Sequence, residues 1–205
     1  MNFLEFREEL SAFTVFSYPD ILKVNPSFDR RRLVEWQAKK YILKIRNGYY
    51  CFPQKEINES YLMYISNKIY KPSYISMETA LSYYNLIPEA VYLFTGISTR
   101  KTMLFESALG NYQYRKIKTE LFFGYSIIQI DDFDIKIADM EKTVLDFLYF
   151  NIIDDWKALD GMRLNRLAAR KRIDQDKLRN YLSQYNSAKM NYRIKLFLNY
   201  IDAEP

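Results

Sequence analysis

The sequence predicts an α+β fold, and three observations along the chain support it. Apolar residues recur at helical spacing near the N-terminus and are followed by Asn47-Gly48, the strongest two-residue hairpin signal. Short strand-like runs then follow one another between residues 90 and 139. Helical spacing returns over residues 140–150 and 154–201. We therefore expect a small helical unit with a hairpin, then a mostly antiparallel sheet, and finally a helical C-terminal part.

Three helices are predicted before the hairpin. The first, over residues 2–13, carries apolar residues on one face: Phe3, Phe6, Leu10 and Phe13. Ser17 is a suitable N-cap for a second helix over 18–24, which must end before Pro26. Ser27 is then placed to cap a third helix that runs to about Lys40. At 100° per residue, one side of that helix carries Leu33 and Trp36, and the other side carries Arg31, Arg32 and Lys39.

The hairpin is predicted from the stretch "YILKIRNGYYCF", residues 41–52. Asn-Gly favours a type I′ turn, in which both central residues have positive φ. Alternation along the second strand predicts that Tyr50 and Phe52 pack inward and that Tyr49 points outward. The order helix, helix, turn, helix, hairpin is that of a winged helix-turn-helix, in which the third helix enters the DNA major groove. We assign this module to residues 1–56.

Positive charge is concentrated in the third helix and the hairpin. The whole chain has a net charge of +5. Seven Lys and Arg against two acids between residues 29 and 46 give the same excess, which suits the phosphates of DNA. The alternative to DNA contact is that the three consecutive arginines simply form a solvent-exposed helix face. The residues predicted to contact double-stranded DNA are Ser27, Arg30, Arg31, Arg32, Lys39, Lys44, Arg46 and Tyr49.

The remainder of the chain is predicted as a linking helix, residues 57–70, followed by an α+β domain, residues 71–205. Ser76 and Asp174 are expected to cap helices in that domain. "DDFD", residues 131–134, would place Asp132 and Asp134 on one strand face, as in metal-dependent nucleotidyl-transfer sites. We favour a polar turn between two strands. The basic segment 163–172 fits a solvated helix, a second DNA contact or a docking patch equally well.

The composition excludes several chemistries. The chain contains no histidine, so zinc sites built on histidine and Ser-His or Cys-His nucleophiles are ruled out. Cys51 is the single cysteine and is expected to be an inert, small apolar residue. We therefore expect no catalytic residue, no metal, no cofactor and no enzyme activity. Neither a signal peptide nor a membrane span is recognisable, which predicts a cytoplasmic protein.

Three stretches carry a resemblance to a known family. They are "YISMETALSYYNLIPEAVYLFTGISTRKT" from Tyr74, "YRKIKTELFFGY" from Tyr114 and "IADMEKTVLDFLYF" from Ile137. With the N-terminal module, they cover about three quarters of the chain. The sequence resembles the AbiEi-type antitoxins and transcriptional regulators of type IV toxin–antitoxin (abortive-infection) systems. Lys116 stands where that family often has a histidine, which removes any titrating role at this position.

The resemblance implies a protein with two functions. Its winged helix would bind inverted repeats in its own promoter and repress it, and its C-terminal domain would counteract a nucleotidyltransferase-type toxin encoded alongside. The resemblance assigns no toxin-contacting residue. Two other classes remain open: a nucleotidyltransferase-related enzyme that uses Asp132 and Asp134, and an orphan regulator or protein-interaction adaptor without a toxin.

Overall fold

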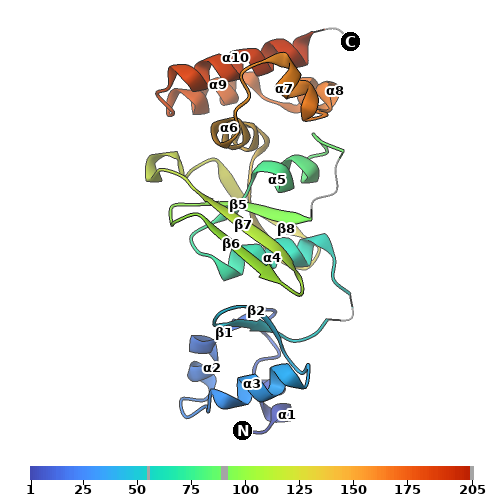
Figure 1. Ribbon diagram of the computed structural model, residues 1–205, viewed down its shortest axis with the longest axis vertical. Helices are drawn as coiled ribbons and strands as arrows, with labels where there is room; N and C mark the ends of the chain where they lie inside the picture. Colours follow the sequence, from blue (N-terminus) through green and yellow to red (C-terminus); the bar gives the residue numbers. More distant parts are fainter. Residues whose placement is uncertain (55, 89–91, 204–205) are drawn as a thin grey trace.

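The computed structural model describes residues 1–54, 56–88 and 92–203 and has an α+β fold. Its elements follow one another along the long axis of the molecule (Figure 1). A helical unit with a small sheet forms one end, a six-stranded sheet lies in the middle, and a helical region forms the other end. The predicted order of a helical unit with a hairpin, a sheet and a helical C-terminal part is confirmed.

The N-terminal unit consists of three helices and a three-stranded antiparallel sheet of order β1-β3-β2. Its elements are α1 (Phe3–Glu9), β1 (Phe16–Ser17), α2 (Tyr18–Val24), α3 (Arg31–Ala38), β2 (Leu43–Arg46) and β3 (Tyr49–Cys51). An aromatic-rich core joins them, with the buried side chains of Phe6, Phe16, Leu33, Trp36 and Tyr50 among its members. Phe52 packs against this core, so the predicted inward orientation of Tyr50 and Phe52 is confirmed.

The caps of the first two helices follow from short-range hydrogen bonds. Ser17 caps α2 and forms a capping box with Asp20, as the sequence predicts for its N-cap. Helix α2 ends at Val24, before Pro26, also as predicted. Helix α1 ends at Glu9, earlier than expected, and Phe13 lies beyond it with 37% of its surface exposed.

The hairpin turn differs from the predicted type. Gly48 has a φ of 81°, whereas Asn47 does not have a positive φ, so the type I′ assignment is wrong. The strand pairing shifts register between Lys44 and Arg46, which marks a β-bulge. A bulge supplies the extra twist that a type I′ turn would otherwise provide.

The central sheet has the strand order β6-β7-β5-β4-β9-β8. Its strands are β4 (Tyr74–Ile75), β5 (Leu93–Ser98), β6 (Met103–Ser107), β7 (Gly110–Lys116), β8 (Tyr125–Ile130) and β9 (Phe133–Ala138). The β5–β7 and β4–β9 pairs are parallel and the other neighbours are antiparallel, so the sheet is mixed, and the prediction of a mostly antiparallel sheet missed the two parallel pairs. Strand-like runs were predictable from the sequence, but such runs do not specify which strands pair.

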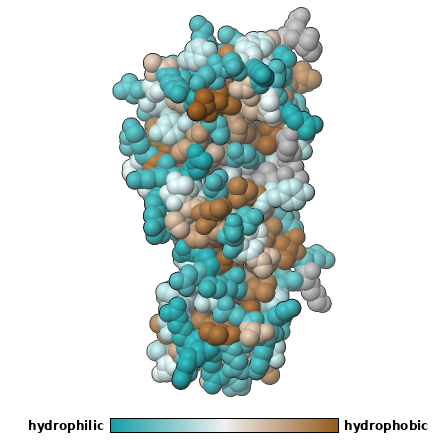
Figure 2. Space-filling view, in the orientation of Figure 1, coloured by the Kyte–Doolittle hydropathy of each residue, from teal (hydrophilic) through white to brown (hydrophobic). Residues whose placement is uncertain are grey.

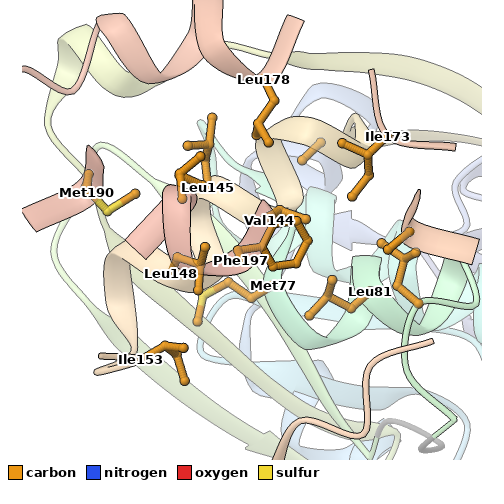
Figure 3. Packing of buried hydrophobic residues seen from close by; sticks show 14 of the residues in the cluster. Met77, Leu81, Val144, Leu145, Leu148, Ile153, Ile173, Leu178, Met190 and Phe197 are labelled. Atoms are coloured by element: carbon orange, nitrogen blue, oxygen red, sulfur yellow. The ribbon is translucent and has the colours of Figure 1, made fainter. Parts of the chain in front are cut away.

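Helices cover both faces of this sheet (Figure 1). Helix α4 (Glu59–Ile69) packs on the face toward the N-terminal unit. Helices α5 (Met77–Tyr83) and α6 (Met140–Phe150) pack on the opposite face. Of the C-terminal helices, α9 (Gln175–Ser183) and α10 (Ala188–Asp202) pack on α6, and α7 (Trp156–Gly161) and α8 (Arg166–Arg172) pack against α10. Figure 3 shows Val144, Leu145 and Leu148 of α6 among the side chains of this second core.

A buried ion pair lies within that core. Lys142 and Asp146 are one turn apart on α6, and both side chains are fully buried and bonded to each other. Asp146 also accepts hydrogen bonds from Tyr74 at 3.0 Å and Ser76 at 2.8 Å, and Lys142 donates one to Tyr185 at 2.9 Å. Ser76 occupies the N-cap position of α5, but the predicted side-chain cap is absent because its hydroxyl binds Asp146.

The predicted cap at Asp174 is confirmed at the start of α9. None of the helices in the described ranges combines the length and the apolar composition needed to cross a bilayer.

Candidate nucleic-acid interface

Helix α3 presents a buried face and an exposed, charged face. Leu33 and Trp36 point into the N-terminal core, with 1% and 3% of their surfaces exposed. Arg31, Arg32 and Lys39 are exposed. The 100° rotation per residue explains this division, which the sequence predicts correctly. The face turned to the viewer in Figure 2 is mainly hydrophilic at this end of the molecule.

The start of α3 is not capped by Ser27, which corrects the prediction. The helix begins at Arg31, and no side-chain cap bond is made at its N-cap residue. Ser27 is exposed and its backbone N–H donates to the Asn25 side chain at 3.0 Å. Asp29 instead accepts a hydrogen bond from the Arg31 backbone N–H at 2.9 Å, so an acid closer to the helix supplies the local bond.

The three consecutive arginines have different surroundings. Arg30 lies over the ring of Tyr18, 5.1 Å from its centroid. Arg31 forms an ion pair with Asp29 at 2.8 Å while its side chain stays 92% exposed. The side-chain hydrogen bond from Arg31 lowers the pKa of Asp29 and in return raises that of Arg31. Arg32 is exposed beside them.

Lys39 has an intrahelical partner as well. Its ammonium lies 2.6 Å from the Glu35 carboxylate, four residues earlier, on the exposed face. This hydrogen bond lowers the pKa of Glu35 and raises that of Lys39. Exposed pairs of this type are weak, so both Arg31 and Lys39 can exchange their acids for phosphates at little cost.

A groove lies between α3 and the hairpin, and both Arg30 and Lys44 line it. It has a volume of about 290 Å³. Its lining comprises Arg30, Leu33, Val34, Gln37, Lys44, Asn47 and Tyr50. Lys44 is exposed, and Gln37 donates to the Leu33 carbonyl at 2.7 Å. A basic residue on either side of a groove suits one strand of a polyanionic backbone.

Arg46 and Tyr49 lie elsewhere. The Arg46 guanidinium stacks over the rings of Tyr49 and Phe105, with centroid distances of 4.5 and 4.8 Å. Phe105 belongs to β6, so this stack lies where the hairpin meets the central sheet. Arg46 and Tyr49 were predicted to contact DNA together with Lys44, but they pack toward the central sheet instead.

The neighbouring hairpin residues explain why. Ile45 and Cys51 are 1% and 0% exposed and belong to the same core as Tyr61 and Tyr112 of the central unit. The hairpin is therefore buried on both faces, one against the helices of its own unit and the other against the sheet. Burial raises the pKa of the Cys51 thiol to about 11, in line with the expected inert residue.

Two residues that line the groove were not predicted from the sequence to contact DNA. Val34 is 69% exposed on α3, and Asn47 lies at the hairpin tip, and both line the groove. Val34 carries no charge and Asn47 was interpreted only as a turn residue. The helical spacing of α3 would have shown that Val34 lies on its exposed side. The position of Asn47 at the groove depends on how the hairpin packs and could not be read from the sequence.

The acidic stretch 131–134 forms the polar turn that we favoured. Residues 131 and 132 form the turn between β8 and β9, and Asp131 has a φ of 50°. The Asp131 carboxylate accepts hydrogen bonds from Ser60 at 2.6 Å and Asn58 at 3.3 Å. Within the ranges that the structure describes, three or more potential metal-ligating side chains do not gather anywhere.

The basic segment 163–172 holds the helical end together. Arg166 donates to the Ala203 carbonyl, and Arg172 donates to the Tyr84 carbonyl at 2.6 Å. Arg170 lies 3.7 Å from Asp202. These three contacts anchor α8 to its neighbours and involve three of the five basic residues in the segment.

Comparison with known proteins adds no family assignment. No protein-family model matches the chain, and no curated protein matches its sequence. The fold and the geometry described above therefore carry the functional conclusion.

Proposed function

We propose that the chain is a DNA-binding transcriptional repressor whose N-terminal unit is a winged helix-turn-helix. Helix α3 would enter the major groove, and the groove beside it would receive a phosphate strand. The observation that carries this proposal is the exposed basic face of α3 beside a groove with Arg30 and Lys44 on its two sides. The contact set becomes Arg30, Arg31, Arg32, Lys39 and Lys44, without Ser27, Arg46 and Tyr49.

The resemblance to AbiEi-type regulators extends the proposal. By that resemblance, the operator is an inverted repeat in the chain's own promoter, and the C-terminal domain counteracts a nucleotidyltransferase-type toxin. What supports this part is the resemblance of the central motifs alone, and no toxin contact is assigned. Co-expression with a neighbouring nucleotidyltransferase-like gene tests it, because rescue of growth is expected only if the two proteins form a pair.

A binding titration tests the DNA-binding part. Fluorescence anisotropy would compare a duplex from the chain's upstream region with a shuffled duplex of the same composition, at several salt concentrations. We expect tighter binding of the upstream duplex and an affinity that falls as salt rises, because phosphate contacts release counterions. Equal and salt-independent retention of both duplexes would contradict the proposal.

A substitution of Arg32 distinguishes a contact with a base from a contact with a phosphate. Replacing Arg32 by Lys keeps the charge but removes the planar fork that binds guanine with two hydrogen bonds. If Arg32 contacts a base, the preference for the upstream duplex decreases while the salt dependence is unchanged. If it contacts only phosphate, both duplexes keep their affinities.

A further inference from the structure

A hollow in the central unit is large enough for a small molecule. Its volume is about 680 Å³, within the range of about 300–1,000 Å³ that is usual for ligand sites. It lies between α5, the strands β5 and β7, and the helices α6 and α7. Leu81, labelled in Figure 3, belongs both to the buried core and to the lining, so part of the hollow's wall is the surface of the core.

Of the described residues that line the hollow, Glu78 carries a charge. It is the second residue of α5 and is half-buried. Its Oε2 atom is fully buried and receives no hydrogen bond from the described residues. The described residues give Glu78 no ion pair either. A buried carboxylate oxygen without a donor is costly, and the described residues leave the negative charge of Glu78 uncompensated.

A second polar group lies on the sheet below. Gln113 of β7 is half-buried and lines the hollow, and it is paired in register with Thr95 of β5. The Thr95 hydroxyl is already used, since it donates to the Ser76 carbonyl at 2.7 Å. Within the described residues the Gln113 amide makes no hydrogen bond. The hollow therefore offers one carboxylate and one amide to whatever enters it.

Apart from Thr95, the other lining residues that the structure describes are apolar or aromatic. Phe147 of α6 and Met162, next to α7, are half-buried in the wall, and Tyr92 at the rim is 86% exposed. Aromatic faces attract flat cations, and a carboxylate matches the paired N–H groups of a guanidinium or an amidinium. A ligand that carries both a planar cation and an apolar part satisfies every group named here.

We propose that this hollow binds a small planar organic cation of the guanidinium or amidinium class. The cation pairs with Glu78, a further polar group of the ligand bonds Gln113, and the apolar part lies against Phe147 and Met162. The site shares no residue with the candidate nucleic-acid interface, so a test of ligand binding here is independent of the test of DNA binding.

Benzamidine and benzamide are suitable probes, because they have the same shape and only the first is charged at neutral pH. Titration of the full chain, followed by calorimetry and by backbone amide NMR shifts, is expected to give benzamidine an advantage of about tenfold, since charge-assisted hydrogen bonds are the stronger ones. The shifts are expected at Glu78, Gln113 and Met162. Because this measurement uses the unaltered chain, it does not depend on the folding of any variant.

Two variants localise the charge. Glu78→Gln keeps the shape of the side chain and is expected to reduce benzamidine binding to the level of benzamide. Glu120→Gln, at the surface in the 3₁₀ turn Thr119–Leu121, serves as the matched control and is expected to change nothing. Equal binding of the two probes, shifts confined to other parts of the chain, or no binding at millimolar concentration would each overturn the proposal.

Discussion

Lys44 and Arg46 are two residues apart on β2, yet their side chains have different surroundings. Regular alternation would place both on the same face of the strand. The register shift between them interrupts this alternation, so Lys44 lies at the groove while Arg46 lies over Phe105. A bulge typically redirects side chains in this way. Similar residues therefore have different roles here: one is available to a ligand and the other is part of the structure.

This difference predicts opposite effects of two alanine substitutions. Lys44→Ala is expected to weaken binding of all duplexes and to reduce the slope of log K against log salt by about one, because one phosphate contact is lost. Arg46→Ala is expected to leave that slope unchanged and to lower the melting temperature, since its stacking on Tyr49 and Phe105 is lost. Anisotropy titrations and thermal melts measure the two effects. A reduced slope in Arg46→Ala with unchanged stability would return Arg46 to the DNA surface.

At the scale of whole elements, helices α3 and α6 carry the same kind of pair in opposite environments. Each has a lysine and an acid four residues apart, Glu35 with Lys39 on α3 and Lys142 with Asp146 on α6. The first pair is exposed and the second is fully buried. Burial raises the pKa of Asp146 and lowers that of Lys142, because both charges have lost water. The spacing is the same and the order is reversed, so the sequence spacing alone does not reveal which of the two pairs is buried.

Removing one member of the buried pair is expected to be strongly destabilising. Lys142→Met leaves the Asp146 carboxylate buried without its cation and should cost about 3–5 kcal/mol of unfolding free energy. Chemical denaturation of Lys142→Met, of Asp146→Leu and of the double variant measures the coupling, and the double variant should recover much of the loss.

The exposed pair on α3 supplies the control. Lys39→Met removes the same kind of partner from Glu35 and should leave the denaturation midpoint almost unchanged. Equal midpoint shifts for Lys142→Met and Lys39→Met would show that the loss of the buried pair costs no more stability than the loss of the exposed one.

For the whole molecule, the main feature is that the hairpin lies between two cores. Tyr50 belongs to the aromatic core of the N-terminal unit, whereas Ile45 and Cys51 belong to the core under the central sheet. The N-terminal unit and the sheet therefore meet through the hairpin, next to α4 (Figure 1). A ligand that moved the hairpin would disturb both cores.

Cys51 reports on this contact. Because burial raises its pKa from 9.0 to about 11, the thiolate fraction at pH 8 falls by about a hundredfold, and labelling by a thiol reagent should slow by at least that factor relative to the unfolded chain. Ile45→Asp places a charge in the contact and should restore rapid labelling. Val34→Asp, on the exposed part of α3, should not. Labelling of the unaltered chain as fast as in denaturant would contradict a docked hairpin.

Elements with local causes were predictable from the amino-acid sequence alone. Apolar spacing predicted the face of α3 with Leu33 and Trp36, and it predicted helix α6 over residues 140–150. The caps at Ser17 and Asp174 depend on hydrogen bonds within one turn, so they too were predictable. Strand-like runs separated by turn signals likewise located strands β6 to β9.

The contacts between elements that are distant in the sequence depend on long-range packing and were not predictable in the same way. The parallel pairing of β5 with β7, the burial of Lys142 and the docking of Arg46 on Phe105 all join residues that are distant in the sequence or hidden from its periodicity. Ser27 and Ser76 show the same limit. Helix α3 begins three residues later than a cap at Ser27 would require, and the Ser76 hydroxyl at the N-cap of α5 binds Asp146 instead. Local preferences are weak compared with the burial of apolar surface, so long-range packing selects among them.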